Sequence, residues 1–118
     1  MLMNVSDRRV FLACGATDMR KSIDGLAGIV QAGFSLDPFE NSLFVFCNKN
    51  RNRIKILEWD GNGFWLHLKR LEKGRFRWPE PGDEPTMTLT GEELSVLLGG
   101  TKVELKIRRK TVFERRAV

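Results

Sequence analysis

Residues 53–70, RIKILEWDGNGFWLHLKR, decide the fold that we expect for this chain of 118 residues. Two segments that alternate apolar and polar residues flank a Gly-Asn-Gly turn at 61–63, which predicts a β-hairpin. A three-residue loop with Gly63 in the left-handed conformation sets Trp59 across from Trp65, on one face of the sheet. The same register pairs Leu57 with His67, Lys55 with Lys69, Ile56 with Leu68 and Glu58 with Leu66.

The sequence on either side of the hairpin supplies the other strands. Residues 43–47, LFVFC, form an uninterrupted apolar run, which predicts a strand buried on both faces. The polar residues 48–52 predict the turn into the hairpin, and residues 9–14, RVFLAC, predict another short strand. Near the end of the chain, residues 102–108 alternate charged and apolar side chains, which predicts a half-buried strand.

Two helices are expected to pack on these strands. An apolar stripe at helical spacing predicts a helix that begins after Thr17, a suitable N-cap, and ends near Gly33. Thr90 and Glu93 have the spacing of a capping box, and the glycines that follow predict the end of a second helix over 90–99. The stripe of the first helix consists of Met19, Ile23, Leu26, Val30 and Phe34.

The element order β-α-β-β-β-α-β predicts a single α+β domain over residues 1–118. We expect a mostly antiparallel sheet with a central β-hairpin, packed by the N-terminal helix, with a shorter helix near 90–99 and a C-terminal strand. An acidic, proline-rich loop is expected at 79–88 and a basic tail at 108–118. No apolar run approaches the roughly 18 residues of a membrane span, and the N-terminus lacks the order of a signal peptide, so we expect a cytoplasmic protein with no membrane partner.

The charges are unevenly distributed along the chain. Residues 48–78 carry nine basic and three acidic groups, whereas residues 79–100 carry five acidic groups and no basic one. Residues 101–118 are basic again, with seven basic and two acidic groups. This pattern predicts a polyanionic partner, and the alternative is a solvated surface whose charge is simply uneven.

Enzyme classes fit the sequence poorly. It has one histidine and neither a nucleophile-elbow nor a phosphate-loop motif, so we expect no catalytic residue and no cofactor. Asp18, Asp24 and Asp37 could hold Mg²⁺ for phosphodiester chemistry, but a helix start and a turn explain the first and the last more simply. Cys14 and Cys47 lie in apolar runs and are expected to be buried thiols rather than metal ligands, although the sequence does not exclude a disulfide.

Two groups of cations are candidate binding sites. Arg20 and Lys21, in the first turn of the expected helix, would form an anion site with the free N–H groups there, unless Asp18 or Asp24 neutralises them. One face of the hairpin combines rings with cations, as base stacking and phosphate neutralisation require; alternatively, its two tryptophans fill the core under the first helix. The residues of this face are Arg53, Lys55, Trp59, Trp65, His67 and Lys69, with Arg70, Lys73, Arg75 and Arg77 just beyond.

Three segments carry a resemblance to a known family. They are VFLACGATDMRKSIDGLAGIVQ (10–31), LDPFENSLFVFCNKNRNRIKILEWDGNGFWLHLKRLEKGRFRWP (36–79) and LTGEELSVLLGG (89–100). Together they resemble the TnpB accessory protein of the family-sixty-six bacterial insertion sequences, the product of their second reading frame. The resemblance implies a small accessory protein of transposition, encoded beside a separate transposase that carries the catalytic carboxylates.

The residues and the resemblance lead to two hypotheses. The first is a non-catalytic accessory protein that binds transposon-end DNA, the transposase or both through the hairpin face and the Arg20–Lys21 pair. The second is a pure protein–protein adaptor whose basic surface engages an acidic segment of the transposase without DNA contact. The expected partners are therefore the transposase of the same element and DNA, bound weakly and with low specificity, and a homodimer is a further possible assembly.

Overall fold

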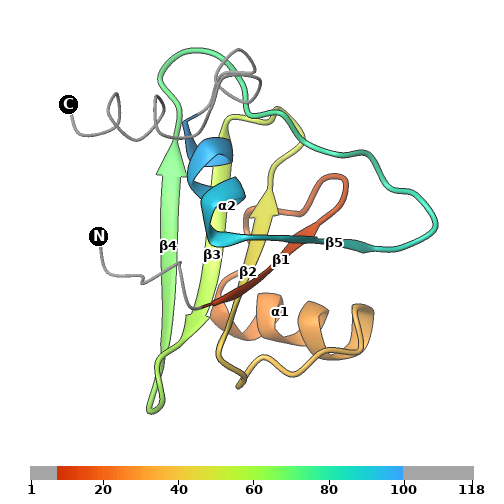
Figure 1. Ribbon diagram of the computed structural model, residues 1–118, viewed down its shortest axis with the longest axis vertical. Coiled ribbons are helices and arrows are strands. Elements are labelled where there is room, and N and C mark those ends of the chain that lie inside the picture. The colour runs from red at the N-terminus through yellow and green to blue at the C-terminus, as the bar shows by residue number, and fades with distance from the viewer. Residues whose placement is uncertain (1–7, 100–118) are drawn as a thin grey trace.

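The computed structural model describes residues 8–99, which form one five-stranded sheet in the order β4-β3-β2-β1-β5 (Figure 1). The β1–β2 pair is parallel and the other strand pairs are antiparallel, which confirms the α+β class expected from the sequence. In chain order the elements are β1 (Arg9–Ala13), α1 (Ile23–Gly28), the π-helical turn η2 (Ile29–Gly33), β2 (Ser42–Cys47), β3 (Arg53–Trp59), β4 (Phe64–Arg70), β5 (Thr86–Leu89) and α2 (Gly91–Leu98). No helix in this part of the chain is long and apolar enough to cross a membrane.

The hydrophobic core lies on both faces of the sheet because neighbouring residues of a strand point to opposite sides. On β2, Phe44 and Phe46 pack with α1, while Leu43, Val45 and Cys47 pack on the side of α2. All six residues of β2 are buried, which confirms the strand predicted at 43–47. The apolar stripe of the first helix also packs in the α1 layer, as expected.

The first helix begins five residues later than the sequence predicts. Thr17 is not its N-cap, because the Thr17 N–H donates to the Cys47 carbonyl instead. Ser22 occupies the N-cap position and makes no side-chain cap bond. The carbonyls of Met19 and Lys21, which a helix would use for its own ladder, accept hydrogen bonds from Lys55 at 2.7 and 2.8 Å. The helix does end at Gly33, in a π-helical turn.

The hairpin is shifted by one residue from the predicted register. The Asp60 carboxylate accepts from the backbone N–H groups of Asn62 and Gly63, and the Asp60 N–H donates to the Gly63 carbonyl, so the loop has four residues, 60–63. Gly61, with φ 107°, takes the left-handed position that we expected at Gly63. Trp59 therefore lies across from Phe64 and not from Trp65. Since a shift by one residue exchanges the faces of a strand, the predicted pairing of side chains is wrong.

The second half of the chain holds one strand that the sequence analysis missed. The acidic loop expected over 79–88 ends earlier, because Thr86–Leu89 pair with β1 as β5. The capping box of α2 is confirmed: Thr90 accepts from the Glu93 N–H, and Glu93 accepts from the Thr90 N–H. The strand predicted at 102–108 and the basic tail at 108–118 lie outside the described residues.

Candidate nucleic-acid interface

The predicted hairpin face does not exist as one surface. Trp59 points to the α1 side of the sheet, together with Arg53 and Lys55, whereas the residues predicted opposite them point to the α2 side. A single platform of both tryptophans with the four other residues is therefore wrong. The residues on the α2 side are Trp65, His67 and Lys69.

The cations of the 48–78 block instead gather at the end of the sheet where β3 begins and β4 ends. Two backbone hydrogen bonds join the β2–β3 turn to the segment after β4: the Leu71 N–H donates to the Asn52 carbonyl, and the Phe76 N–H donates to the Arg51 carbonyl. Arg53 and Arg70 are direct cross-strand partners. We call this cluster the basic end; it comprises Lys49, Arg51, Arg53, Arg70, Lys73 and Arg75.

Asn48 builds the turn that carries half of the basic end. Its side-chain oxygen accepts from the N–H groups of Asn52 and Arg53, each at 3.0 Å, and its amide nitrogen donates to the Asn52 side chain. Arg51 adopts φ 62° in this turn, a left-handed conformation that is uncommon for residues other than glycine and asparagine. Lys49 and Arg51 were not among the predicted site residues, although both lie in the basic 48–78 block.

Buried rings anchor the other half of the basic end. After Gly74, which turns the chain with φ 78°, Arg75 and Arg77 alternate with Phe76 and Trp78. The two arginines are exposed, whereas Phe76 is 2% and Trp78 7% exposed. The Trp78 indole N–H also donates to the Ala13 carbonyl at 2.8 Å. The segment is thus held against the sheet by its apolar side chains, with its cations on the outside.

Two cations of the basic end already have carboxylate partners. Arg51 pairs with Glu80, and Arg70 pairs with Glu72 at 2.9 Å. Exposed ion pairs of this kind contribute little to stability, so a competing anion could replace the carboxylate. The other four cations of the basic end make no ion pair within residues 8–99.

The predicted anion site at Arg20 and Lys21 is not at a helix terminus, because both residues precede α1. Asp18 binds the Arg20 guanidinium through both carboxylate oxygens, which confirms local neutralisation of that arginine. Hydrogen bonds from Arg20 hold the pKa of the Asp18 carboxyl well below its ordinary value. Lys55 is likewise occupied with the carbonyls of Met19 and Lys21, and so it holds this segment over β3.

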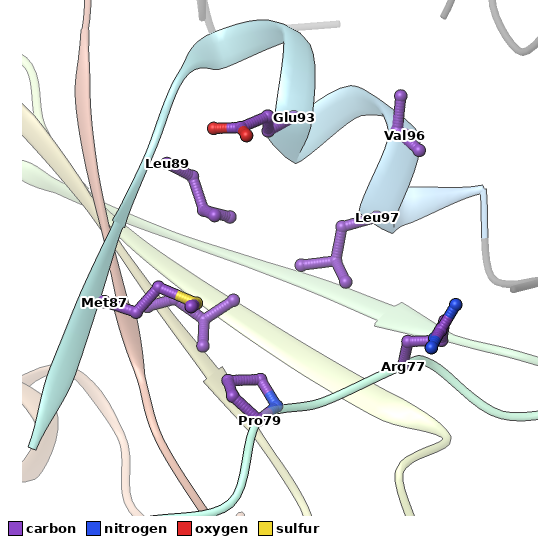
Figure 2. Close-up of a pocket in the computed structure, with 8 residues that line it drawn as sticks. Arg77, Pro79, Met87, Leu89, Glu93, Val96 and Leu97 are labelled. Carbon is purple, nitrogen blue, oxygen red and sulfur yellow. The ribbon is translucent and has the colours of Figure 1, made fainter. Parts of the chain in front are cut away.

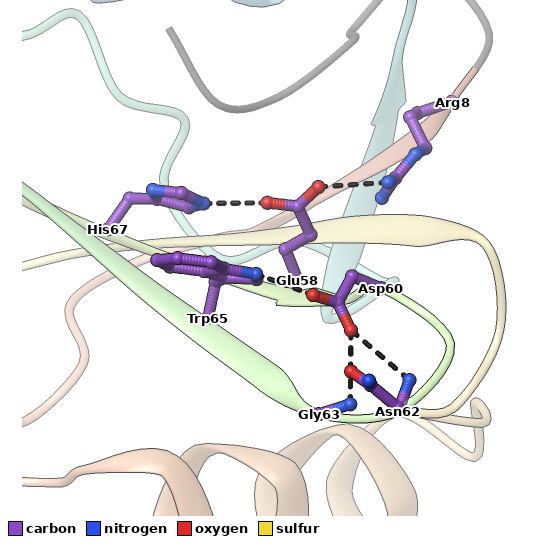
Figure 3. A network of polar contacts seen from close by, with 7 residues as sticks. All are labelled: Arg8, Glu58, Asp60, Asn62, Gly63, Trp65 and His67. Atoms are coloured by element: carbon purple, nitrogen blue, oxygen red, sulfur yellow. Dashed lines mark hydrogen bonds and ion pairs between the residues drawn. The ribbon is translucent and has the colours of Figure 1, made fainter.

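The opposite end of the hairpin is acidic and aromatic (Figure 3). Glu58 is buried and bonds Arg8 at 2.8 Å and His67 at 2.7 Å. Trp65 stacks on His67 and donates its indole N–H to Asp60 at 2.7 Å. Hydrogen bonds from the Asn62 backbone and the Trp65 ring lower the pKa of Asp60, so a carboxylate stands beside this ring.

Trp59 packs in an aromatic cluster at the same end, on the α1 side. Its ring lies 5.0 Å from that of Phe39 and 4.9 Å from that of Phe64, both in edge-on contacts. Trp59 is only partly buried and belongs to neither core cluster, so it packs against aromatic rings at the edge of the sheet and does not fill the core under the first helix. Trp65, in contrast, is 45% exposed.

Arg77, two residues beyond the basic end, lines a groove between β5, α2 and the chain near Pro79 (Figure 2). This hollow has a volume of about 240 Å³. Its lining is mostly apolar and includes Met87, which is 46% exposed, while Arg77 and Glu93 contribute the charged groups. The remaining lining residues are Leu12, Pro79, Leu89, Val96 and Leu97.

Metal and thiol chemistry find little support in this part of the chain. No group of three or more His, Cys, Asp or Glu side chains within residues 8–99 could hold a metal ion, so Asp18, Asp24 and Asp37 form no such cluster. Cys14 and Cys47 are both free thiols; Cys47 is buried, as expected, whereas Cys14 is only partly so. Burial raises the pKa of the Cys47 thiol to about 12.

Comparison with known proteins finds one family model and two relatives that match most of this chain. The model of the family described as IS66 Orf2 like protein matches residues 8–108. The Sinorhizobium fredii protein y4hO is 38% identical over 100 residues, which cover 85% of this chain and 86% of that protein. A second protein of the same organism, y4jC, is 34% identical over 107 residues, which cover 87% of this chain and 91% of y4jC. No solved structure matches.

Proposed function

This chain belongs to the IS66 Orf2-like family of transposition accessory proteins, and from that premise we propose that it binds DNA, without catalysis, through its basic end. The candidate partners of such a protein are the DNA of the element and the transposase encoded beside it. The DNA is the partner that the charges of the basic end favour.

The single observation that carries this proposal is the cross-strand pair Arg53–Arg70. Like charges directly opposite each other in a sheet are destabilising, and the exposed carboxylate of Glu72 compensates only Arg70. A bound anion would compensate Arg53 as well. A guanidinium presents a planar fork of N–H donors that fits phosphate oxygens. Lys49, Lys73 and Arg75 extend the same positive surface on the two segments that flank the pair.

The number of cations sets the expected strength of binding. Four of the six make no ion pair within residues 8–99, and two others are held only by exposed carboxylates. Four to six phosphate contacts correspond to a slope of about −4 to −5 in log K against log salt. Non-specific affinity at physiological salt is then on the order of 10⁻⁴ to 10⁻⁶ M in Kd.

A pure adaptor function is the second candidate, and a specific observation favours it. Arg20, Arg51 and Arg70 each already hold a carboxylate of this chain. An acidic segment of the transposase would offer the same groups and could replace these partners. An adaptor of this kind would bind the transposase equally well with and without nuclease treatment, and it would not bind DNA.

The test is fluorescence anisotropy with a labelled duplex of arbitrary sequence, measured at several salt concentrations. The variant Arg53→Glu/Arg75→Glu removes two contacts from the basic end, and we expect a weaker affinity and a shallower salt slope. Arg9→Glu is the matched control, because Arg9 is exposed at the other end of the sheet, where β1 and β2 begin. It should change binding much less.

Two results would contradict the proposal. The first is a wild-type protein that does not bind DNA even at low salt. The second is equal weakening by Arg9→Glu and by a single Arg53→Glu change, which would mean that only net charge matters. Retention of the transposase in nuclease-treated extracts, together with either result, would favour the adaptor.

A further inference from the structure

We infer that the DNA bound at the basic end is a duplex held through its phosphates, and not a single strand held by stacked bases; this substrate class rests on the proposed function. Proteins that bind single strands combine a basic groove with aromatic rings on which the bases stack. Both ingredients are present in this chain, but the fold places them at opposite ends of the β3–β4 hairpin.

The aromatic rings near the basic end are not available for stacking. Phe76 and Trp78, which alternate with arginines in the sequence, are 2% and 7% exposed. Phe76 packs in the core on the α2 side, and the Trp78 ring is fixed by its bond to Ala13. Their role is to anchor the chain that carries Lys73 and Arg75.

The exposed rings within residues 8–99 lie at the far end of the hairpin. Phe39 is 54% and Trp65 45% exposed, and Phe39 contacts Trp59 at the end of β3. Trp59 is six residues from Arg53 along the same strand, a separation of about 20 Å at 3.3 Å per residue. This is about twice the Debye length at 0.1 M salt, so a base stacked there gains little from the basic end.

The surroundings of Trp65 also disfavour a nucleic-acid strand. Asp60 bonds the indole N–H at 2.7 Å, and Glu58, the cross-strand partner of Trp65, bonds His67, on which the Trp65 ring stacks (Figure 3). A phosphate that followed a base onto this ring would meet the Asp60 carboxylate. Stacking and phosphate neutralisation are therefore separated at both ends of the hairpin.

The basic end itself suits a ligand whose charges have fixed positions. Arg53 and Arg70 stand on paired strands, and two backbone hydrogen bonds tie the segment with Lys73 and Arg75 to the β2–β3 turn. Such an array is preorganised for the regular phosphates of a duplex. Duplex DNA also carries one negative charge for each 1.7 Å of its axis, which gives it the steeper salt slope for the same number of contacts.

The experiment compares a labelled duplex of about 20 base pairs with each of its strands, using the full chain and anisotropy at several salt concentrations. Variants at both ends of the hairpin separate the two contributions: Trp65→Ala and Phe39→Ala at the aromatic end, and Arg53→Glu/Arg75→Glu at the basic end. Circular dichroism checks that each variant is folded. Phe39 and Trp65 are exposed, so their truncation is expected to leave the fold intact.

We expect the duplex to bind at least several-fold more tightly than either strand. Both aromatic variants should bind the duplex within twofold of the wild type, and the double charge reversal should weaken it by about tenfold or more. A single strand that binds as tightly as the duplex and loses about 5- to 150-fold on Trp65→Ala would overturn the inference. Single-strand binding that depends only on the basic end would overturn it too, but would leave the proposed function in place, whereas no binding of any form would overturn both.

Discussion

The buried carboxylate of Glu58 offers the sharpest test of how this domain is held together. Its side chain is only 4% exposed, and its two oxygens bond Arg8, which precedes β1, and His67 of β4. The Glu58→Gln variant keeps the shape of the side chain but removes its charge. The Arg8 guanidinium, 14% exposed and already with one nitrogen that has no hydrogen-bond partner, would then be buried without a counter-charge.

The expected loss is about 3–5 kcal/mol in the free energy of unfolding, the usual cost of leaving a buried charge unpaired. Domains of this size are stable by about 5–15 kcal/mol, so the change is large. With an m-value of about 1–3 kcal/mol per molar urea, the unfolding midpoint should fall by about 1 M or more. Urea unfolding followed by tryptophan fluorescence measures it.

The matched control is Glu72→Gln, which removes the partner of Arg70 at the surface. Those side chains are 58% and 76% exposed, and such pairs contribute about 0–1 kcal/mol. The double variant Glu58→Gln/Arg8→Met should recover part of the loss, because the unpaired charge is removed as well. If Glu58→Gln shifts the midpoint no more than Glu72→Gln does, the cluster is not a buried ion pair and the reasoning fails.

Three further predictions concern the turn, a thiol and a helix cap. Gly61→Ala should destabilise the domain by about 1–2 kcal/mol, because φ 107° is strained for any residue with a Cβ. Gly63→Ala should be nearly neutral. If thermal unfolding shows Gly63→Ala to be the more destabilising of the two, the three-residue loop is the correct one. Burial raises the pKa of the Cys47 thiol to about 12 in the folded protein, whereas the thiol ionises near pH 9 when the chain is unfolded. The free energy of unfolding should therefore be constant below pH 9 and fall by about 1.4 kcal/mol per pH unit as the pH rises from 9 toward 12. Urea unfolding between pH 8 and 10 should reveal this fall in the wild type relative to Cys47→Ala, and parallel profiles would count against it. Thr90→Ala should cost about 1 kcal/mol through the lost capping box, and an unchanged midpoint would mean that this cap does not stabilise α2.

Local signals in the sequence were sufficient for much of the fold. The uninterrupted apolar run at 43–47 predicted a doubly buried strand because both of its faces had to be covered, and β2 is such a strand. The spacing of Thr90 and Glu93 predicted the start of α2 because a capping box involves only neighbouring residues. The excess of cations in residues 48–78 also located the basic end, since charge is a property of the residues themselves.

Long-range contacts decided the features that the sequence analysis missed. Lys55 takes the carbonyls of Met19 and Lys21 from 34 or more residues away, and this delays the start of α1. β5 was missed because its four residues form a strand only by pairing with β1.

A local sequence pattern also could not predict the hairpin register or the contact between residues 48–53 and 70–76. The Asp60 side chain accepts from two backbone N–H groups of the loop, so the loop begins one residue earlier than glycine spacing suggested. This one-residue shift sends Trp59 and Trp65 to opposite faces. Residues 48–53 and 70–76 lie side by side through backbone bonds that have no counterpart in the residue pattern. The buried strand, the helix cap and the excess of cations could thus be predicted from the residues alone, because they depend on side-chain chemistry and short spacing. Which cations share a surface, and which rings are distant from them, follows from the backbone hydrogen bonds between distant segments, and no local pattern encodes those bonds.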